Sequence, residues 1–342
     1  MSIAGGVAQV PVFDHLYRLT DGRGLFEHAL HRDPRRDHGY CLDDVARALV
    51  VTCREPRPDA RMQLLARHYL DFALSAVQPD GSCHNRMSAD GDWSDEPALG
   101  DWWGRVLWGL GIAAVHAPTQ AMRASALLGF RTAAQRRSPH RRAMAFAALG
   151  AGELLLARQD ELSARELLPD AVAAIGAGEA TSDWPWPERR LTYANGSIAE
   201  ALLVAGAALP DAAAHARGLQ LLRFLLDTET RDGHLSLTAV SGRGPGESAP
   251  RFDQQPIEAA SLADACARAY AATDDPQWLR GVYMAWAWFA GDNDNGTPMY
   301  DPETGGGFDG LQRHGCNLNQ GAESTLALLS TAQQAKRLGV LG

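Results

Sequence analysis

The sequence of 342 residues lacks several features that would assign it to a broad class of proteins. It has no run of basic residues and a formal net charge of -9, which argues against nucleic acid as a partner, because phosphate binding needs a basic face. It has no window of about 18 apolar residues, so we expect no segment to span a membrane. Residues 1–13 lack a basic stretch followed by an apolar one, so we expect no secretory signal.

Cysteine is also scarce, with five residues that are odd in number and widely separated. Such a set is typical of free thiols in a reducing compartment, and it predicts a cytoplasmic protein. Three cysteines have a nearby histidine, in the pairs His38 with Cys41, Cys83 with His84 and His314 with Cys316. None of these pairs has a CxxC-type spacing, and together they do not predict four ligands at one point. We therefore expect no metal and no other cofactor, although these pairs leave a zinc site open.

Runs of β-branched residues with period-two alternation are nearly absent, whereas Ala- and Leu-rich stretches with helical spacing recur along the chain. The predicted helices alternate between two kinds. One kind follows a polar loop and consists mainly of small and apolar residues, and these helices start near residues 43, 101, 140, 195, 256 and 319. The other kind carries charge along one face, over residues 61–77, 120–136, 161–175, 211–226 and 276–290, with a sixth expected within 13–30.

This alternation predicts a double ring in which the apolar helices are inner and the half-polar helices are outer. The expected fold is an all-α (α/α)6 toroid, formed by residues 13–342 as a single domain after an N-terminal extension of residues 1–12. The inner helices start at uneven intervals, so long loops are inserted on one face, where function concentrates in repeat folds. We expect the pocket at this face, where the inner helices begin.

Five of the six inner helices follow loops rich in residue types that bind sugars. These loops cover residues 36–47, 80–105, 183–196, 251–260 and 296–324, whereas the third inner helix lacks such a loop. Aromatic faces stack on sugar rings, and charged or amide groups bond hydroxyls. The candidate substrate-binding residues are His38, Tyr40, Arg47, His84, Asn85, Trp102, Trp103, Arg105, Trp186, Asn195, Gln254, Gln255, Asp309, His314, Asn319 and Gln320.

Acidic residues at the starts of the inner helices are candidates for catalysis. Glycoside cleavage needs a proton donor and a second carboxylate. The candidates are Asp43, Asp44, Asp101, Glu258 and Glu323. Each has a structural alternative, because Asp and Asn favour N-caps and Glu in a first turn complements the helix dipole.

The spacing of the arginines separates these acids into two groups. Arg47 and Arg105 lie four residues after Asp43 and Asp101, on the same helix face, so each predicts an ion pair. Asp43 and Asp101 are then supports, which leaves Asp44, Glu258 and Glu323 for acid–base work. The first inner helix of a six-fold ring lies beside the sixth and two positions from the fifth, so these side chains are expected to converge.

Five motifs, in order, give the chain a family resemblance: RDHGYCLDDVARAL, GDWWGRVLWGLG, FDQQPIEAASLADAC, YDPETGGGFDGL and NQGAESTLALL. Over residues 13–335 it resembles a bacterial six-hairpin glycosidase-like family, whose members occur beside or fused to glycosyltransferases and near β-mannoside phosphorylases. The resemblance implies the same toroid, a mannose-containing oligosaccharide and a glycosyltransferase partner. The chain departs from the family at Trp102 and Trp103, where related members have Ser-His.

Three functions follow from these observations. The first is a glycoside hydrolase that acts on an oligosaccharide through carboxylate acid–base catalysis. The second is a carbohydrate-binding partner of a glycosyltransferase without catalysis. The third is a sugar epimerase on the same fold, which would use histidines as acid and base. The histidines available for that role are His38, His84 and His314.

Overall fold

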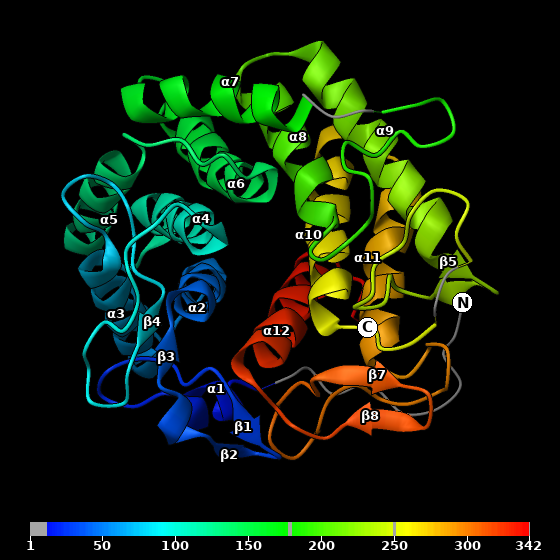
Figure 1. The fold of residues 1–342 in the computed structure, drawn as a ribbon, viewed down its shortest axis with the longest axis horizontal. Helices are drawn as coiled ribbons and strands as arrows, with labels where there is room; N and C mark the ends of the chain where they lie inside the picture. The colour runs from blue at the N-terminus through cyan, green and yellow to red at the C-terminus, as the bar shows by residue number, and fades with distance from the viewer. Residues whose placement is uncertain (1–11, 177–179, 249–250, 342) are drawn as a thin grey trace.

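The computed structural model describes residues 12–176, 180–248 and 251–341, and within them the helices form two concentric rings (Figure 1). Each inner helix packs on the next one, and the last packs on the first, so the inner ring closes. The predicted extension of residues 1–12 lies, apart from Val12, outside the described residues. The inner helices are α2 (Leu42–Arg54), α4 (Asp101–His116), α6 (Arg141–Ala157), α8 (Gly196–Ala208), α10 (Pro256–Thr273) and α12 (Ala322–Arg337).

Each outer helix packs mainly against one inner helix, as the alternation in the sequence predicts. They are α1 (Asp14–Leu19), α3 (Ala60–Ala76), α5 (Gln120–Ala133), α7 (Leu162–Gly176), α9 (Ala212–Glu229) and α11 (Pro276–Phe289). Burial follows the two predicted kinds of helix. In α8 every residue from Gly196 to Gly206 is buried, whereas α9 buries one stripe, which contains Leu221, Leu222 and Leu225.

The sixth outer helix is much shorter than residues 13–30. Helix α1 ends at Leu19, because the next residues form a turn in which Asp21 Oδ1 accepts hydrogen bonds from the amides of Arg23 and Gly24. The chain then enters strand β1 (Ala29–Leu30). The sequence pattern missed this turn.

Short strands form four two-stranded antiparallel sheets in the described loops. Three pairs are hairpins between neighbouring strands: β1 with β2 (Asp33–Pro34), β5 (Thr230–Arg231) with β6 (His234–Leu235), and β7 (Gly310–Gln312) with β8 (Gly315–Asn317). The fourth pair joins distant loops, because β3 (Tyr40–Cys41), directly before α2, pairs with β4 (Arg86–Met87), in the loop before α4. This sheet holds the first two motif-rich loops together.

Helix starts are capped differently in the two rings. Four outer helices have an N-cap side chain that accepts an amide hydrogen bond: Asp59, Thr119, Asp211 and Asp275. None of the six inner helices, all within the described residues, is capped by its own N-cap side chain. Their first amides are therefore left for side chains from neighbouring loops and helices.

Glycines allow α4 and α6 to lie in close contact. A β-carbon at Gly111 would overlap the carbonyl of Gly150, and one at Gly150 would overlap the carbonyl of Leu107.

The described residues contain no helix that is both long and apolar enough to cross a membrane.

We expect Gly150→Ala to lower the free energy of unfolding by about 1–3 kcal/mol, because the added methyl group has no space between the two backbones. Urea denaturation monitored by circular dichroism measures the change. Gly176→Ala is the matched control, since a β-carbon there meets nothing within 4 Å. Equal losses in the two variants would contradict this explanation.

Candidate active site

The loops before five of the six inner helices, all but α6, are joined at one end of the ring. In addition to the β3–β4 sheet, single β-bridges link Leu191 to Arg243 and Gln254 to both Ala239 and Leu311. These bridges connect the loops before α8, α10 and α12. The end of the ring that bears the N-termini of the inner helices is therefore a continuous loop surface, as the motif positions predict.

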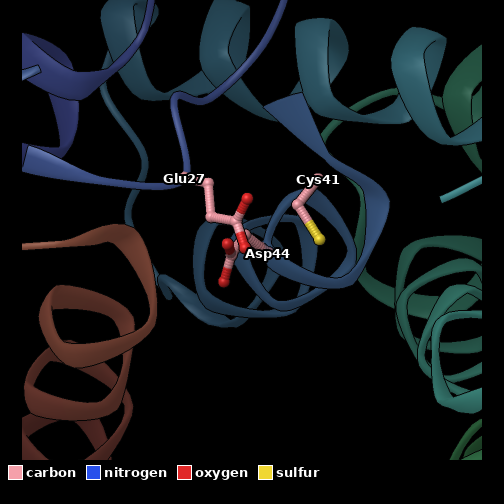
Figure 2. Close-up of side chains that lie close together, drawn as sticks. All are labelled: Glu27, Cys41 and Asp44. Carbon is pink, nitrogen blue, oxygen red and sulfur yellow. The ribbon is translucent and has the colours of Figure 1, made fainter. Parts of the chain in front are cut away.

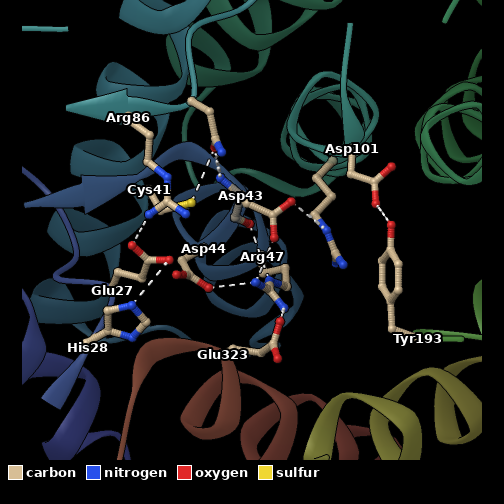
Figure 3. Close-up of polar contacts among 12 residues, drawn as sticks. Glu27, His28, Cys41, Asp43, Asp44, Arg47, Arg86, Asp101, Tyr193 and Glu323 are labelled. Atoms are coloured by element: carbon tan, nitrogen blue, oxygen red, sulfur yellow. Dashed lines mark hydrogen bonds and ion pairs between the residues drawn. The ribbon is translucent and has the colours of Figure 1, made fainter. Parts of the chain in front are cut away.

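Arg47, on α2, is the centre of an ionic cluster at this end (Figure 3). Its Nη2 donates to Asp43 Oδ2 at 2.8 Å and to Asp44 Oδ1 at 2.7 Å. Its Nη1 donates to Glu323 Oε2, on α12, at 2.5 Å. The guanidinium is almost completely buried. The structure thus brings together three of the predicted catalytic acids and one predicted arginine.

Arg105 pairs with a different acid from the one predicted by its spacing. Its Nε lies 2.8 Å from Asp43 Oδ1, across the α2–α4 contact, and not against Asp101. Asp101 Oδ2 instead accepts a hydrogen bond from the hydroxyl of Tyr193. The Asp43–Arg47 pair is found as predicted. Asp43 is therefore held by two arginines, and Asp101 is held by a tyrosine from the loop before α8.

Three further residues of the cluster were missed by the sequence analysis. Glu27 forms an ion pair with Arg86 and lies 3.6 Å from Nε2 of His28. Glu27 and His28 lie within residues 13–30, where an outer helix was expected, and Arg86 belongs to β4, so none of them begins an inner helix. Only the tertiary fold brings them to α2, and no local signal in the sequence identifies them.

The cluster contains more carboxyl groups than guanidinium groups. Four acids, Glu27, Asp43, Asp44 and Glu323, face three arginines, Arg47, Arg86 and Arg105. Like charges this close disfavour full ionisation, so the cluster favours keeping one proton.

Asp44 is the acid best placed to keep that proton. It is 3% exposed, and burial is the main cause that raises its pKa to about 8, with Asp43, Glu323 and Glu27 adding to the rise and Arg47 opposing it. Burial also acts on Glu323, but Arg47 and its hydrogen bond hold the pKa of Glu323 below its usual value. The Glu323 side chain is 39% exposed. One guanidinium therefore binds a buried carboxylic acid and an accessible carboxylate.

The side chains of Glu27, Cys41 and Asp44 lie close together, with one potential ligand atom of each within 4.8 Å of the others (Figure 2). Their surroundings do not suit a metal ion. Arg86 already binds Glu27 and Arg47 binds Asp44, so two cations occupy the carboxylates. Burial raises the pKa of the Cys41 thiol well above its usual value, and this thiol donates to Asn85 Oδ1 at 3.3 Å. A protonated thiol is a poor metal ligand.

Glu258 lies apart from the cluster. Its carboxylate is 2% exposed and accepts hydrogen bonds from the amide of Ala194 at 2.5 Å and from the amide and side chain of Asn195 at 3.2 and 3.0 Å. Glu258, on α10, therefore binds the two backbone amides directly before α8, those of Ala194 and of the N-cap residue Asn195. Burial and Glu229 raise the pKa of Glu258 to about 8. This arrangement favours the structural alternative for Glu258.

Several residues expected to bind sugar lie in the core instead. Tyr40 is buried, stacks on Phe26 and donates its hydroxyl to Asp21. Trp103 and Trp186 are fully buried, with Trp103 Nε1 donating to the Ala133 carbonyl. These aromatic side chains fill space between helices because a ring wall needs large apolar groups, so they present no face to a ligand.

Most of the glutamines, asparagines and the aspartate predicted to bind sugar instead hold loops in place through hydrogen bonds to the protein. The Gln254 side chain bonds Trp288 and Asp294, and that of Gln320 bonds Thr304 and Asp301. Asn319, Asn85 and Asp309 accept from the backbone amides of His31, Asp43 and Gly321 respectively. Gln255 is the N-cap residue of α10 and is half-buried. Apart from Gln255, these polar groups are bound to the protein.

The remaining predicted residues lie at the surface of the loops. His38 and His314 are exposed, whereas His84 stacks on Trp93 and its Nδ1 lies 2.7 Å from the Asp95 carbonyl. The half-buried Trp102 donates a hydrogen bond from its Nε1 to the backbone carbonyl of Cys83 at 2.8 Å. The predicted Cys–His pairs are therefore not brought together around one point by these contacts.

A cavity of about 580 Å3 opens at this end of the ring, between α4, α6 and the loop before α8. Asp101, Arg142, Glu188 and Tyr193 line it. The Tyr193 ring is 40% exposed and lies 4.6 Å from the Arg142 guanidinium carbon. The cavity coincides with the one inner helix that lacks a long preceding loop, so the missing loop leaves this side of the surface open.

A scan against models of protein families found no match, and a search of curated proteins found none either. Among solved structures, the chain is similar to a sugar epimerase from a ruminal bacterium, with 12% identity, 95% of each chain covered and a TM-score of 0.71. A cellobiose 2-epimerase from Bacillus thermoamylovorans matches at 11% identity, covering 95% of this chain and 96% of that one, with a TM-score of 0.71. The GH76 alpha-mannanase of Bacteroides thetaiotaomicron matches at 11% identity, 88% of each chain and a TM-score of 0.58.

These matches show the fold. The single-domain (α/α)6 toroid predicted from the sequence is confirmed, and it is the fold of six-hairpin glycosidases and of sugar epimerases.

We expect Arg47→Gln to lower the free energy of unfolding at pH 7 by about 3–5 kcal/mol, because it leaves buried carboxylates without their shared counter-charge. Urea denaturation measures the loss. Arg67→Gln is the control: Arg67 forms an exposed pair with Asp71 at 3.1 Å, which is worth about 0–1 kcal/mol. A loss no larger than that of the control would show that Arg47 does not neutralise the cluster.

Proposed function

We propose that the protein is a glycoside hydrolase that acts on an oligosaccharide, with Asp44 as the general acid and Glu323 as the second carboxylate. The observation that carries this proposal is the shared guanidinium of Arg47, which binds the buried Asp44 through Nη2 and the more accessible Glu323 through Nη1. Burial raises the pKa of Asp44 to about 8 and Arg47 lowers that of Glu323, which favours a proton on Asp44 and a charge on Glu323. Glycoside cleavage uses this combination, one acid to protonate the leaving oxygen and one carboxylate as base or nucleophile.

The surroundings separate the roles of the acids. Asp43 is bound by Arg47 and Arg105 together, so it is a support that positions Arg47. Glu323 is the most accessible carboxylate of the Arg47 set, and it comes from α12 while the acid comes from α2. A sugar bound between the starts of these two helices would meet both groups. The cavity beside Tyr193 would then take further sugar units of the chain.

The first experiment is a screen for release of reducing sugar from manno- and gluco-oligosaccharides, and turnover of any of them supports the proposal. Manno-oligosaccharides come first, because the motif resemblance points to mannose. Binding without turnover across the panel would favour a carbohydrate-binding module instead.

We expect Asp44→Asn and Glu323→Gln each to lower kcat by a factor of about 10² or more, the usual cost of a lost general acid or base. Asp44→Asn should keep its stability at neutral pH, because the amide resembles the protonated acid that the fold favours. Glu258→Gln is the matched control, in which kcat should stay within a few-fold, because Glu258 lies outside the cluster and binds the amides of Ala194 and Asn195. Normal turnover in both cluster variants would rule out these roles.

The pH dependence of kcat/KM follows from the same assignment. A general acid must be protonated, so activity is expected to fall as pH rises through about 8, the pKa to which burial raises Asp44. Arg47 holds the pKa of Glu323 low, so activity should persist below the usual pKa of a glutamate before it declines. A rate profile on the best substrate tests both limbs. An alkaline limb that is unchanged in a residual-activity assay of Asp44→Asn would contradict the assignment.

A sugar epimerase is the second candidate, and one contact favours it. The rings of His28 and His38 lie 5.1 Å apart at the edge of the cluster, and His28 is beside Glu27. Two imidazoles at a site can exchange a proton with a sugar carbon. Incubation of free mannose, glucose and cellobiose in D2O, followed by NMR, tests for interconversion with deuterium uptake. Interconversion that is lost in His28→Asn, without any hydrolysis, would replace the hydrolase proposal.

A further inference from the structure

A second cavity lies at the opposite end of the ring, where the inner helices finish. It has a volume of about 940 Å3, within the range of pockets that bind small molecules. All six inner helices contribute to its lining, which includes Arg54, His116, Glu153, Glu200, Arg268 and Gln334. No motif of the sequence analysis and no part of the proposed mechanism uses this cavity.

The buried acids of this cavity already have partners. Asp264 is bound by Arg54 Nη1 at 2.9 Å and by Gln334 Nε2 at 2.5 Å. Glu200 is bound by Arg268 Nε at 3.1 Å. Both carboxylates are almost completely buried, and these pairs form the floor of the cavity. A further acid of the lining, the half-buried Glu55, accepts a hydrogen bond from Gln333 Nε2 at 3.3 Å.

Glu153 completes this floor, with His116 Nε2 at 2.7 Å and Arg268 Nη2 at 3.5 Å. These contacts, together with the charge of Arg54, lower its pKa to about 2, against the opposing effect of burial. It is therefore an ionised and neutralised acid.

Three basic residues around the cavity have no carboxylate partner among the described residues: Arg123, Lys336 and Arg337. Arg337 donates both Nε and Nη2 to Gln334 Oε1, and Arg123 donates to the carbonyl of Ala117. Burial lowers the pKa of Arg337, and repulsion by the like charges of Arg54 and Arg268 adds to this effect, while Asp264 and Glu153 oppose it. An anion bound among the three guanidinium groups would relieve this repulsion.

The local charge is opposite to that of the whole chain. The chain carries 41 acidic and 32 basic residues, whereas basic side chains outnumber acidic ones around this cavity. Amide side chains, which can bond hydroxyls, are also present, since Gln63, Gln333 and Gln334 line the cavity. The combination suits a ligand with an anionic group and several hydroxyls.

We propose that this cavity is a second ligand site for a small polyhydroxylated anion such as a sugar phosphate, whose anionic group is bound by Arg337 with Arg54 and Arg268. Arginine binds phosphate oxygens through paired hydrogen bonds, which a neutral sugar cannot match. The carboxylates and amides of the floor would accept the hydroxyl hydrogens. The proposal does not depend on hydrolase activity at the other end of the ring.

Isothermal titration of the full-length protein with glucose 6-phosphate, at low salt, tests this site. We expect saturable binding that is weakened roughly tenfold or more in Arg337→Gln, a typical effect of losing a charge-assisted hydrogen bond. Arg337 has no ion-pair partner, so this variant should fold, as its thermal denaturation will show. Binding should be unchanged in Arg67→Gln, which removes an exposed charge on α3, and in Asp44→Asn at the other end.

Three results would overturn the proposal. The first is no saturable binding of glucose 6-phosphate or inorganic phosphate up to about 10 mM, well above the affinity expected of a built site. The second is glucose that binds as tightly as glucose 6-phosphate, because the anionic group would then contribute nothing. The third is binding that is lost in Asp44→Asn but retained in Arg337→Gln, which would place the phosphate at the N-terminal end of the ring.

Discussion

The candidate site depends on the interaction of one guanidinium with three carboxyl groups. Arg47 bonds Asp43, Asp44 and Glu323, and it is buried where its charge is poorly screened. Removing such a charge from water is costly, so the arrangement is stable only because the partners are negative and well placed. Arg105 adds a second counter-charge to Asp43 from the next helix. The contact between α2, α4 and α12 and the protonation of the cluster are thus consequences of the same ion pairs.

The two ends of the ring have different chemistry because a helix exposes different groups at its two ends. At the N-terminal end, free amides attract carboxylates, and Glu258 and Asp309 each bind such amides at the start of a neighbouring or following helix. At the other end, free carbonyls favour basic side chains, and Arg54, Lys336 and Arg337 occupy the last turns of α2 and α12. The same backbone polarity therefore produces an acidic cluster on one face and a basic cavity on the other.

The sequence predicted the ring well because the inner helices are apolar on nearly every side, a pattern that needs no tertiary information. The prediction was less accurate where loops make contacts with residues that are distant in the sequence. Helix α12 begins at Ala322 instead of near residue 319, because Asn319 and Gln320 are held by the backbone of His31. Asp43 and Arg47 were paired by helical spacing, which is local. Arg105 was assigned to the wrong acid, since its contact with Asp43 crosses between helices.

The short connection before α6, which leaves the cavity beside Tyr193 open, has a consequence for how such a ring evolves. Helices α4 and α6 are held together by glycine contacts. Gly104 contacts Ala143 near the short link that joins α5 to α6, whereas Gly111 and Gly150 make contact in the middle turns, away from that link. A longer link at that position would leave those contacts intact and would cover the cavity beside Tyr193. The space at this face for an oligosaccharide is thus set by the length of one connection, that between α5 and α6. This connection can lengthen or shorten while the ring and its ionic cluster stay the same.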